Sequence, residues 1–157
     1  MRIAIRGLLA AFVVALAGCA SAPSMDAMKA DTANYQVPVA PREGRAMVYV
    51  VRPSSMGTLI RFNVFVDNEE AESEVGYTRG AQYIYFSVGP GSRKIMSKAE
   101  NWSEVSFDVK AGDVVYLRQD VSMGLIMARN TISRMDDVTG KYYVKNLSLG
   151  TLLKEGR

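Results

Sequence analysis

YFSVGPGSRKI, residues 85–95, decides the fold class, because it joins two strand-forming runs through a turn signal. Pro90 fixes φ at the first central position of the turn, and Gly91 accepts the positive φ that a type II turn requires at the second. The preceding run, residues 81–88, is rich in aromatic residues, which favour strands. The stretch therefore predicts two strands that pair back on each other across a tight turn.

Further strand and turn signals recur on both sides, at intervals of roughly 8–12 residues. Many of these strands are apolar on both faces, which favours two sheets packed face to face over one open sheet. The predicted strands are Arg45–Pro53, Thr58–Asp67, Ala81–Val88, Arg93–Ala99, Ser103–Val109, Val114–Val121, Gly124–Ser133 and Lys141–Leu149. We therefore predict one all-β domain over residues 44–157, an antiparallel β-sandwich of the immunoglobulin or transthyretin type.

The first 18 residues have the pattern of a bacterial secretory signal peptide. Arg2 and Arg6 precede an uncharged run, residues 7–18, which is shorter than the roughly 20 apolar residues of a transmembrane helix. LAGC, residues 16–19, resembles the bacterial lipobox, in which the cysteine is acylated and becomes the mature N-terminus. A buried apolar cysteine is the alternative interpretation. We expect removal of residues 1–18 and lipidation of Cys19.

The segment after the lipobox predicts where the protein is held. Two or three fatty chains on Cys19 would anchor a small domain firmly, because each buried methylene contributes about 0.8 kcal/mol. Ala20, in place of Asp, resembles the sorting pattern of outer-membrane lipoproteins in Gram-negative bacteria. Residues 19–43 are rich in Ala, Ser, Asp and Pro and predict a flexible tether. We therefore expect a lipid-anchored domain on the periplasmic side of the outer membrane.

Composition excludes several functional classes. The chain has no histidine, and Cys19 is its only cysteine. This excludes zinc sites of His and Cys, disulfides, and nucleophiles activated by histidine. Two of the 19 Lys and Arg residues lie in the signal segment, whereas all 16 Asp and Glu residues follow it, so the remainder is close to neutral. We therefore expect no nucleic-acid partner, no metal site, no cofactor and no enzymatic activity.

Four segments, taken in order, resemble a known family: GRAMVYVVRP (44–53), FNVFVDNEE (62–70), YFSVGPGSRKI (85–95) and FDVKAGDVVYL (107–117). They are similar to the bacterial lipoprotein family catalogued as domain of unknown function 2846, over about residues 44–149. Members usually carry Gly after Val-Asp, where this chain has Asn68, and Asn also tolerates a positive φ. The resemblance implies a sandwich-like fold and an envelope location, and it implies no activity.

Aromatic side chains are the candidate contact residues. Tyr83 and Tyr85 lie on one face of their predicted strand, and Trp102 lies in a predicted loop. Exposed aromatic rings can stack on sugar rings or anchor a protein partner. Cross-strand packing of the tyrosines, and a tryptophan folded over the end of the sandwich, are the structural alternatives.

Five acidic residues fall within residues 67–74 and can be considered as Ca²⁺ ligands. Their spacing does not match an EF-hand loop, because Glu72 stands where that loop needs Gly. A pair of glycosidase carboxylates would need a defined separation across a cleft, which neighbours in a turn rarely provide. A solvated turn is therefore the preferred interpretation.

The expected function follows from the predicted anchor and the absence of catalytic motifs. We expect a non-enzymatic adaptor or envelope-maintenance module that acts through a protein partner in the envelope. One alternative is a lipoprotein that binds cell-wall glycans. Another is a secretion-machine lipoprotein similar to the transthyretin-like component of the type VI system. A hydrolase that uses carboxylates alone fits the sequence least.

Overall fold

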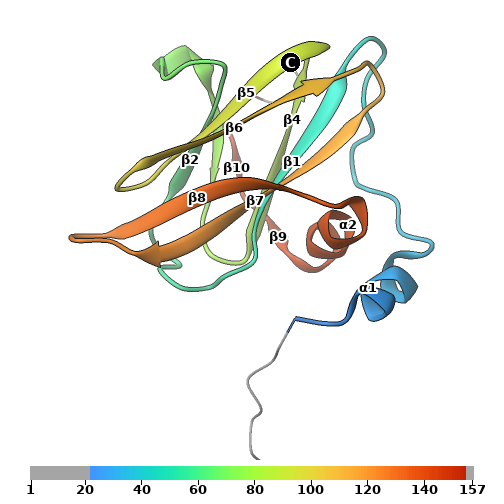
Figure 1. The fold of residues 1–157 in the computed structure, drawn as a ribbon, viewed down its shortest axis with the longest axis horizontal. Coiled ribbons are helices and arrows are strands. Elements are labelled where there is room, and N and C mark those ends of the chain that lie inside the picture. Colours follow the sequence, from blue (N-terminus) through green and yellow to red (C-terminus); the bar gives the residue numbers. More distant parts are fainter. Residues whose placement is uncertain (1–21, 155–157) are drawn as a thin grey trace, which may run out of the picture.

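The computed structural model describes residues 22–154, which form two five-stranded sheets packed face to face (Figure 1). The first sheet contains, in spatial order, β8 (Ala128–Met135), β7 (Val114–Met123), β1 (Ala46–Arg52), β4 (Gln82–Val88) and β9 (Ser148–Leu149). The second contains β10 (Thr151–Leu152), β3 (Glu74–Thr78), β2 (Phe62–Val66), β5 (Gly91–Lys98) and β6 (Trp102–Val109). The predicted β-sandwich is therefore confirmed.

Most neighbouring strands are antiparallel, but β1 pairs with β7, and β4 with β9, in parallel. The first sheet is therefore mixed rather than purely antiparallel. The parallel pairing arises because the chain visits the second sheet between β4 and β7 and returns beside β1 in the same direction.

The turn at Pro90 forms, with Gly91 at a φ of 110°. It does not make a hairpin, however, because β4 belongs to the first sheet and β5 to the second. The turn passes the chain from one layer to the other, and β5 pairs with β2 and β6 instead. Val88 and Ile95, one on each side of the turn, both reach the core between the sheets.

Two apolar clusters lie on opposite faces of the first sheet. The cluster between the sheets includes Val48, Val50, Val64, Ile84, Ile95 and Leu117. The second cluster, on the outer face, includes Met47, Tyr49, Val51, Tyr83, Tyr116 and Val144. Because both of its faces are covered, β1 is buried at all seven of its positions.

A helix replaces the strand predicted for Lys141–Leu149. Helix α2 (Asp137–Asn146) is capped by Asp136, whose Oδ1 accepts a hydrogen bond of 2.9 Å from the amide of Thr139. Such a cap fixes the start of a helix. Tyr143, Val144 and Leu147 recur at helical spacing and pack on the outer face of the first sheet.

The segment before the sandwich is also folded onto the domain. Helix α1 (Met25–Thr32) packs against α2, and its Met28 is only 5 % exposed. The Lys145 ammonium lies 2.7 Å from the Asp31 carboxylate, which joins the two helices. This differs from the flexible tether expected for residues 19–43, because Met28 and the apolar residues that follow α1 find a buried surface. Within residues 22–154, neither α1 nor α2 has the length and apolar character needed to cross a membrane.

Candidate functional site

The structure places the two predicted contact tyrosines on one face of β4, as expected from their spacing. Their rings pack against Tyr49, at centroid distances of 6.2 Å for Tyr83 and 5.8 Å for Tyr85. Tyr83 is only 8 % exposed, and its burial raises the pKa of its hydroxyl. Both rings therefore pack in the outer-face cluster. Little of the Tyr83 side chain is left available to a ligand.

Trp102 lies on the other sheet, at the first residue of β6 rather than in a loop. Its ring is half-buried and meets Phe65 edge-on at 5.1 Å, with the Lys98 ammonium 4.9 Å from the ring centre. The structure therefore does not bring Trp102 together with Tyr83 and Tyr85. The fourth predicted site residue, Cys19, lies outside the described residues.

The acidic turn is held by local bonds. Asp67, rather than Asn68, takes the positive φ, at 67°. The Asp67 carboxylate lies 2.8 Å from Arg93 Nη1 and accepts a hydrogen bond from the amide of Lys94. Asn68 Oδ1 accepts from Glu70 N and Ser73 Oγ, which closes the turn. Over residues 22–154, no three acidic side chains gather as a metal site would require.

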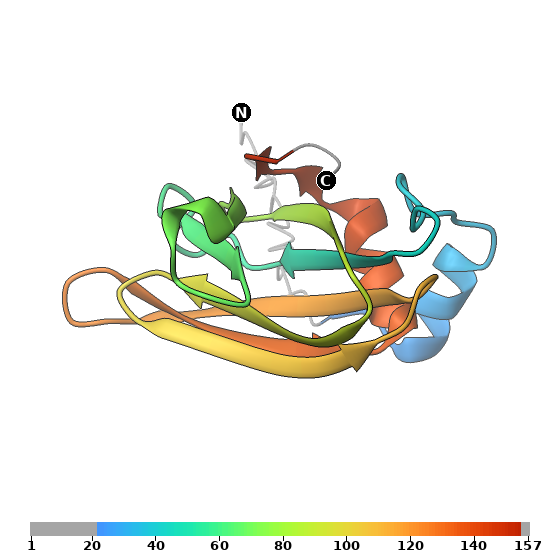
Figure 2. The same cartoon turned by 90° about the horizontal axis from the view of Figure 1, so that it is seen from above.

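An exposed apolar loop joins β7 to β8 and forms what we call the apolar tip, residues 123–127. Met123 is 90 % exposed, Leu125 95 % and Ile126 90 %, while Met127 is half-exposed. Figure 2 shows this loop projecting from one end of the sandwich, with α1 and α2 at the other end. Large side chains left in water in this way are typical of a binding surface.

Glu100, in the β5–β6 turn, fixes the conformation of the tip. Its carboxylate accepts hydrogen bonds from the amides of Leu125 (3.0 Å), Ile126 (3.0 Å) and Met127 (2.7 Å). These bonds lower the pKa of Glu100. Gly124 lets the carboxylate approach, because a Cβ there would lie 2.3 Å from Glu100 Oε2.

A pair of asparagines secures the base of the same hairpin. The amide of Asn130 donates to Asn101 Oδ1, and Asn101 Nδ2 donates to the Asn130 carbonyl, both at 2.9 Å. The β5–β6 turn is therefore bonded both to the tip and to the start of β8. The tip is a preformed structure rather than a free loop.

A second loop, residues 53–61, lies beside the base of the hairpin and exposes Met56 (58 %) and Leu59 (86 %). A Cβ added at Gly57 in this loop would lie 3.7 Å from Ala128 Cβ, which shows how closely the two segments approach. We call the apolar tip together with Met56 and Leu59 the apolar end.

Arg52 holds the second loop from inside the protein. Its guanidinium is fully buried and donates to the carbonyls of Ile60 (2.7 Å), Met56 (2.8 Å) and Gly57 (2.9 Å). It also lies 3.8 Å from the centre of the Phe62 ring, a cation–π contact. Burial lowers the pKa of Arg52. Two buried or half-buried polar groups, Arg52 and Glu100, thus organise the two loops of the apolar end.

Sequence reasoning missed this surface, because residues 124–133 fit a strand. The available signal was the run GLIM after β7, in which apolar residues are consecutive rather than alternating. The exposed side chains of this surface are methionine, leucine and isoleucine. The apolar end is suited to binding by contact.

The fold and this surface define a two-layer β-sandwich with one preorganised apolar end. A family model described as protein of unknown function (DUF2846) matches residues 42–131, more than half of the chain. The chain belongs to this family, as its four quoted segments predicted. The matched region contains Arg52, Glu100 and the whole apolar end, and it stops before α2. No curated protein matches the chain.

Proposed function

We propose that this protein is a lipid-anchored adaptor of the bacterial outer membrane, which binds a protein of the cell envelope through its apolar end. The observation that supports the proposal is the exposure of Leu125 and Ile126 at the apex of a loop held by hydrogen bonds. Burial of a fully exposed Leu or Ile side chain contributes about 1.5–3 kcal/mol. A groove that accepted both would gain much of the affinity of a specific complex.

The rigidity of the tip favours a protein partner. A loop that is already ordered by Glu100 loses little conformational entropy on docking, so more of the burial energy appears as affinity. A protein groove can be complementary in shape to such a preformed loop, whereas a fluid bilayer has no fixed shape to match the loop. The Glu100 carboxylate at the base of the tip would also disfavour an anionic membrane surface.

The predicted anchor supports an adaptor geometry. The described chain begins close to α1, which lies at the opposite end of the sandwich from the tip (Figures 1 and 2). A domain tethered through Cys19 would then be free to present its apolar end away from the attachment point. The lipid would keep the adaptor at the membrane, and the tip would select its partner.

The proposal predicts that two substitutions abolish partner capture. A C-terminally tagged chain is crosslinked in cells and recovered, and it is compared with the Leu125→Ser, Ile126→Ser double variant. We expect one envelope protein to be captured by the wild type and about tenfold less by the variant, because two apolar anchors are lost. Met25→Ser is the matched control: it removes an exposed apolar side chain (44 %) from α1 and should leave capture unchanged.

Cys19→Ser tests the anchor in the same cells. This variant should lose labelling by a fatty-acid probe and should accumulate as an unprocessed precursor.

Equal capture by the wild type and the double variant would contradict a role for the apolar end. Recovery of cell wall alone, reduced by Trp102→Ala, would instead favour the glycan-binding alternative.

A further inference from the structure

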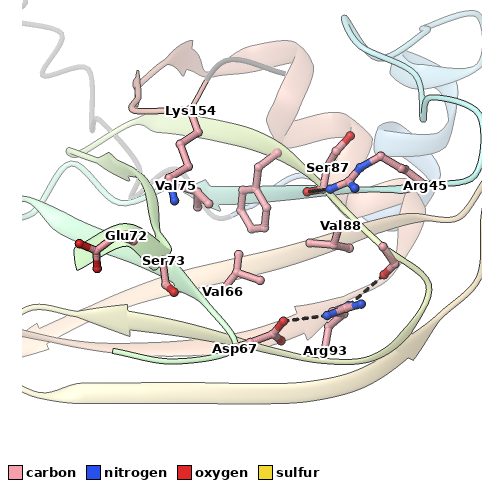
Figure 3. Close-up of a pocket in the computed structure, with 12 residues that line it drawn as sticks. Arg45, Val66, Asp67, Glu72, Ser73, Val75, Ser87, Val88, Arg93 and Lys154 are labelled. Atoms are coloured by element: carbon pink, nitrogen blue, oxygen red, sulfur yellow. Dashed lines mark hydrogen bonds and ion pairs between the residues drawn. The ribbon is translucent and has the colours of Figure 1, made fainter. Parts of the chain in front are cut away.

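A concave site, separate from the projecting apolar end, lies along one side of the sandwich, where the two sheets are not closed against each other. It is a cleft of about 450 Å³ (Figure 3). Strands β9 and β10 pair with β4 and β3 and close one part of that side. The cleft occupies the part next to it, beside the end of β4. Its floor consists of the apolar side chains Val66, Val75, Phe86 and Val88.

The outer edge of β4 is unpaired beside this cleft. β9 pairs only with Gln82 and Tyr83, and no other described strand lies beyond β4. The Tyr83 carbonyl accepts from Gly150 and so points outward, away from β1. Because backbone groups alternate along a strand, those of Tyr85 and Ser87 point outward as well. An exposed strand edge of this kind is a template for an added strand.

The charges around the cleft are unequal. Arg93 and Asp67 neutralise each other at 2.8 Å. Arg45 and Lys154 form no ion pair with any residue in 22–154, and Glu72 is the one other carboxylate among the lining residues of the described chain. Figure 3 shows Lys154 and Arg45 on either side of the apolar floor. The cleft therefore has an excess of positive charge.

Arg45 is partly unsatisfied. Its Nη2 donates to the Ser87 carbonyl at 2.9 Å, which covers one of the outward groups of β4. Its Nε is buried and has no partner among the described residues. A buried donor without a partner is costly, and a rotation of the Arg45 side chain that brought Nε to an incoming acceptor would remove that cost.

We propose that the cleft binds an extended acidic peptide segment of a partner protein, which adds to the first sheet as a strand beside β4. The peptide backbone would pair with the amide and carbonyl of Tyr85 and with the amide of Ser87, whose carbonyl Arg45 already covers, in line with β9. Its apolar side chains would cover Phe86 and Val88, and its carboxylates would meet Arg45 and Lys154. An extended peptide satisfies the strand edge, the apolar floor and the cations together, which is the logic of β-strand addition.

This site is independent of the apolar end. Arg45 precedes β1, whose start pairs with the start of β7, whereas the apolar tip follows the end of β7. The two sites therefore lie at opposite ends of these parallel strands. A variant that disrupts one is expected to leave the other intact, so failure of this proposal is distinguishable from failure of the adaptor proposal.

The test is selection of random dodecapeptides displayed on phage against the purified domain, residues 22–157. We expect enrichment of peptides that combine Asp or Glu with alternating apolar residues. Synthetic copies should shift the amide resonances of Tyr85 and Ser87. Their binding should weaken by about tenfold or more in the Arg45→Gln, Lys154→Gln double variant, as expected when charge-assisted bonds are removed. Two sets of copies, N-methylated at the odd or at the even amides, should differ: the set whose methyl groups face β4 should not bind, because those amides can no longer pair with the strand edge.

Matched variants separate charge at the cleft from charge in general. Lys110→Gln removes an exposed cation that does not line the cleft and should leave binding unchanged. Glu72→Gln removes the opposing carboxylate and should strengthen it. The Leu125→Ser, Ile126→Ser variant should bind the peptides normally. Absence of enrichment, enrichment without acidic residues, or equal binding by the double variant with unchanged thermal stability would each overturn the proposal.

Discussion

A single carboxylate, that of Glu100, holds the conformation of the apolar tip. The three amides that donate hydrogen bonds to it belong to consecutive residues, Leu125, Ile126 and Met127. Because these bonds favour the ionised form, they lower the pKa of Glu100 below its ordinary value of 4.5. The order of the tip is thereby linked to pH.

We predict that the tip loosens in acid. A lowered pKa means that the contribution of Glu100 is fully present above pH 4.5 and is lost as the pH falls through the lowered value. Hydrogen exchange of the three tip amides should therefore accelerate, relative to the core amides, across this range. Glu100→Gln should exchange faster at neutral pH and should lose the pH dependence. If the tip amides of the wild type exchange alike at pH 3 and pH 7, after correction for the intrinsic rates, Glu100 does not hold the loop.

The positions of some residues could be predicted from the sequence, whereas the roles of others could not. The common face of Tyr83 and Tyr85 followed from the period of a strand, which needs no knowledge of the partner strands. The roles of Glu100 and Arg52 did not follow, because each acts on a loop that is placed by the tertiary fold. Arg52 is also an exception to the usual exposure of arginine, and its burial is explained by the carbonyls of residues 56, 57 and 60 and by the Phe62 ring.

At the scale of elements, α2 depends on close contact with β7. Gly140 faces Tyr116, and a Cβ at position 140 would lie 2.2 Å from Tyr116 Cγ and 2.5 Å from Tyr116 Cβ. Tyr116 is 1 % exposed and is held by its neighbours in the outer-face cluster, so its ring cannot move aside. Glycine is needed here for close approach rather than for an unusual φ.

Gly140→Ala is therefore predicted to destabilise the protein, although the same change in an exposed helix stabilises by about 1 kcal/mol. Overpacking against Tyr116 should lower the free energy of unfolding by about 1–3 kcal/mol. Urea denaturation followed by circular dichroism measures this. Lys141→Ala, one residue later in the helix, is the control and should change stability by less than about 0.5 kcal/mol. A higher midpoint for Gly140→Ala would show that α2 is not packed as described.

The elements that sequence reasoning missed were those with competing local signals. KYYV, residues 141–144, is rich in aromatic and β-branched residues, which favour a strand. The cap at Asp136 was the opposing signal for a helix, and the helix forms because it packs on Tyr116. β3 was hidden because it follows an acidic turn and contains Gly76, where Thr151 approaches so closely that a Cβ would lie 2.4 Å from its carbonyl oxygen. The β4–β5 turn was recognised, but its passage between sheets depends on the partners of β5.

At the scale of the whole molecule, residues 25–39 complete the domain. Tyr35, Val37 and Val39 pack on the outer-face cluster. The hydroxyl of Tyr49 donates to the Val39 carbonyl at 2.7 Å and accepts from the Val39 amide at 3.0 Å. Composition alone made this segment resemble a tether, because its few apolar residues are spaced for a surface that another part of the chain supplies.

A shortened chain that begins at Gly44 is therefore predicted to be much less stable than one that begins at Ala22. Loss of the burial of Met28, Tyr35 and Val39 should lower the free energy of unfolding by about 3 kcal/mol or more, and the uncovered cluster should bind a hydrophobic dye. Urea titration of the two chains measures the difference, and equal stability would restore the interpretation of residues 25–43 as a tether.

Titration of Tyr49 distinguishes loss of this cover from general unfolding. Burial raises the pKa of Tyr49 to about 12 in the complete domain. Its contribution to stability is therefore fully present below pH 10, the ordinary tyrosine value, and is lost as the pH rises through about 12. In the shortened chain, Tyr49 loses its cover, and burial is the largest cause of its raised pKa. Its pKa should therefore move back toward 10 while the β-sheet signal persists, although loss of the hydrogen bond from Val39, which lowers the pKa, opposes part of this change. Tyr49→Phe in the longer chain identifies the ionisation of Tyr49, because it removes that transition from the ultraviolet titration curve. If the pKa of Tyr49 is the same in the shortened chain, residues 25–39 do not cover this residue.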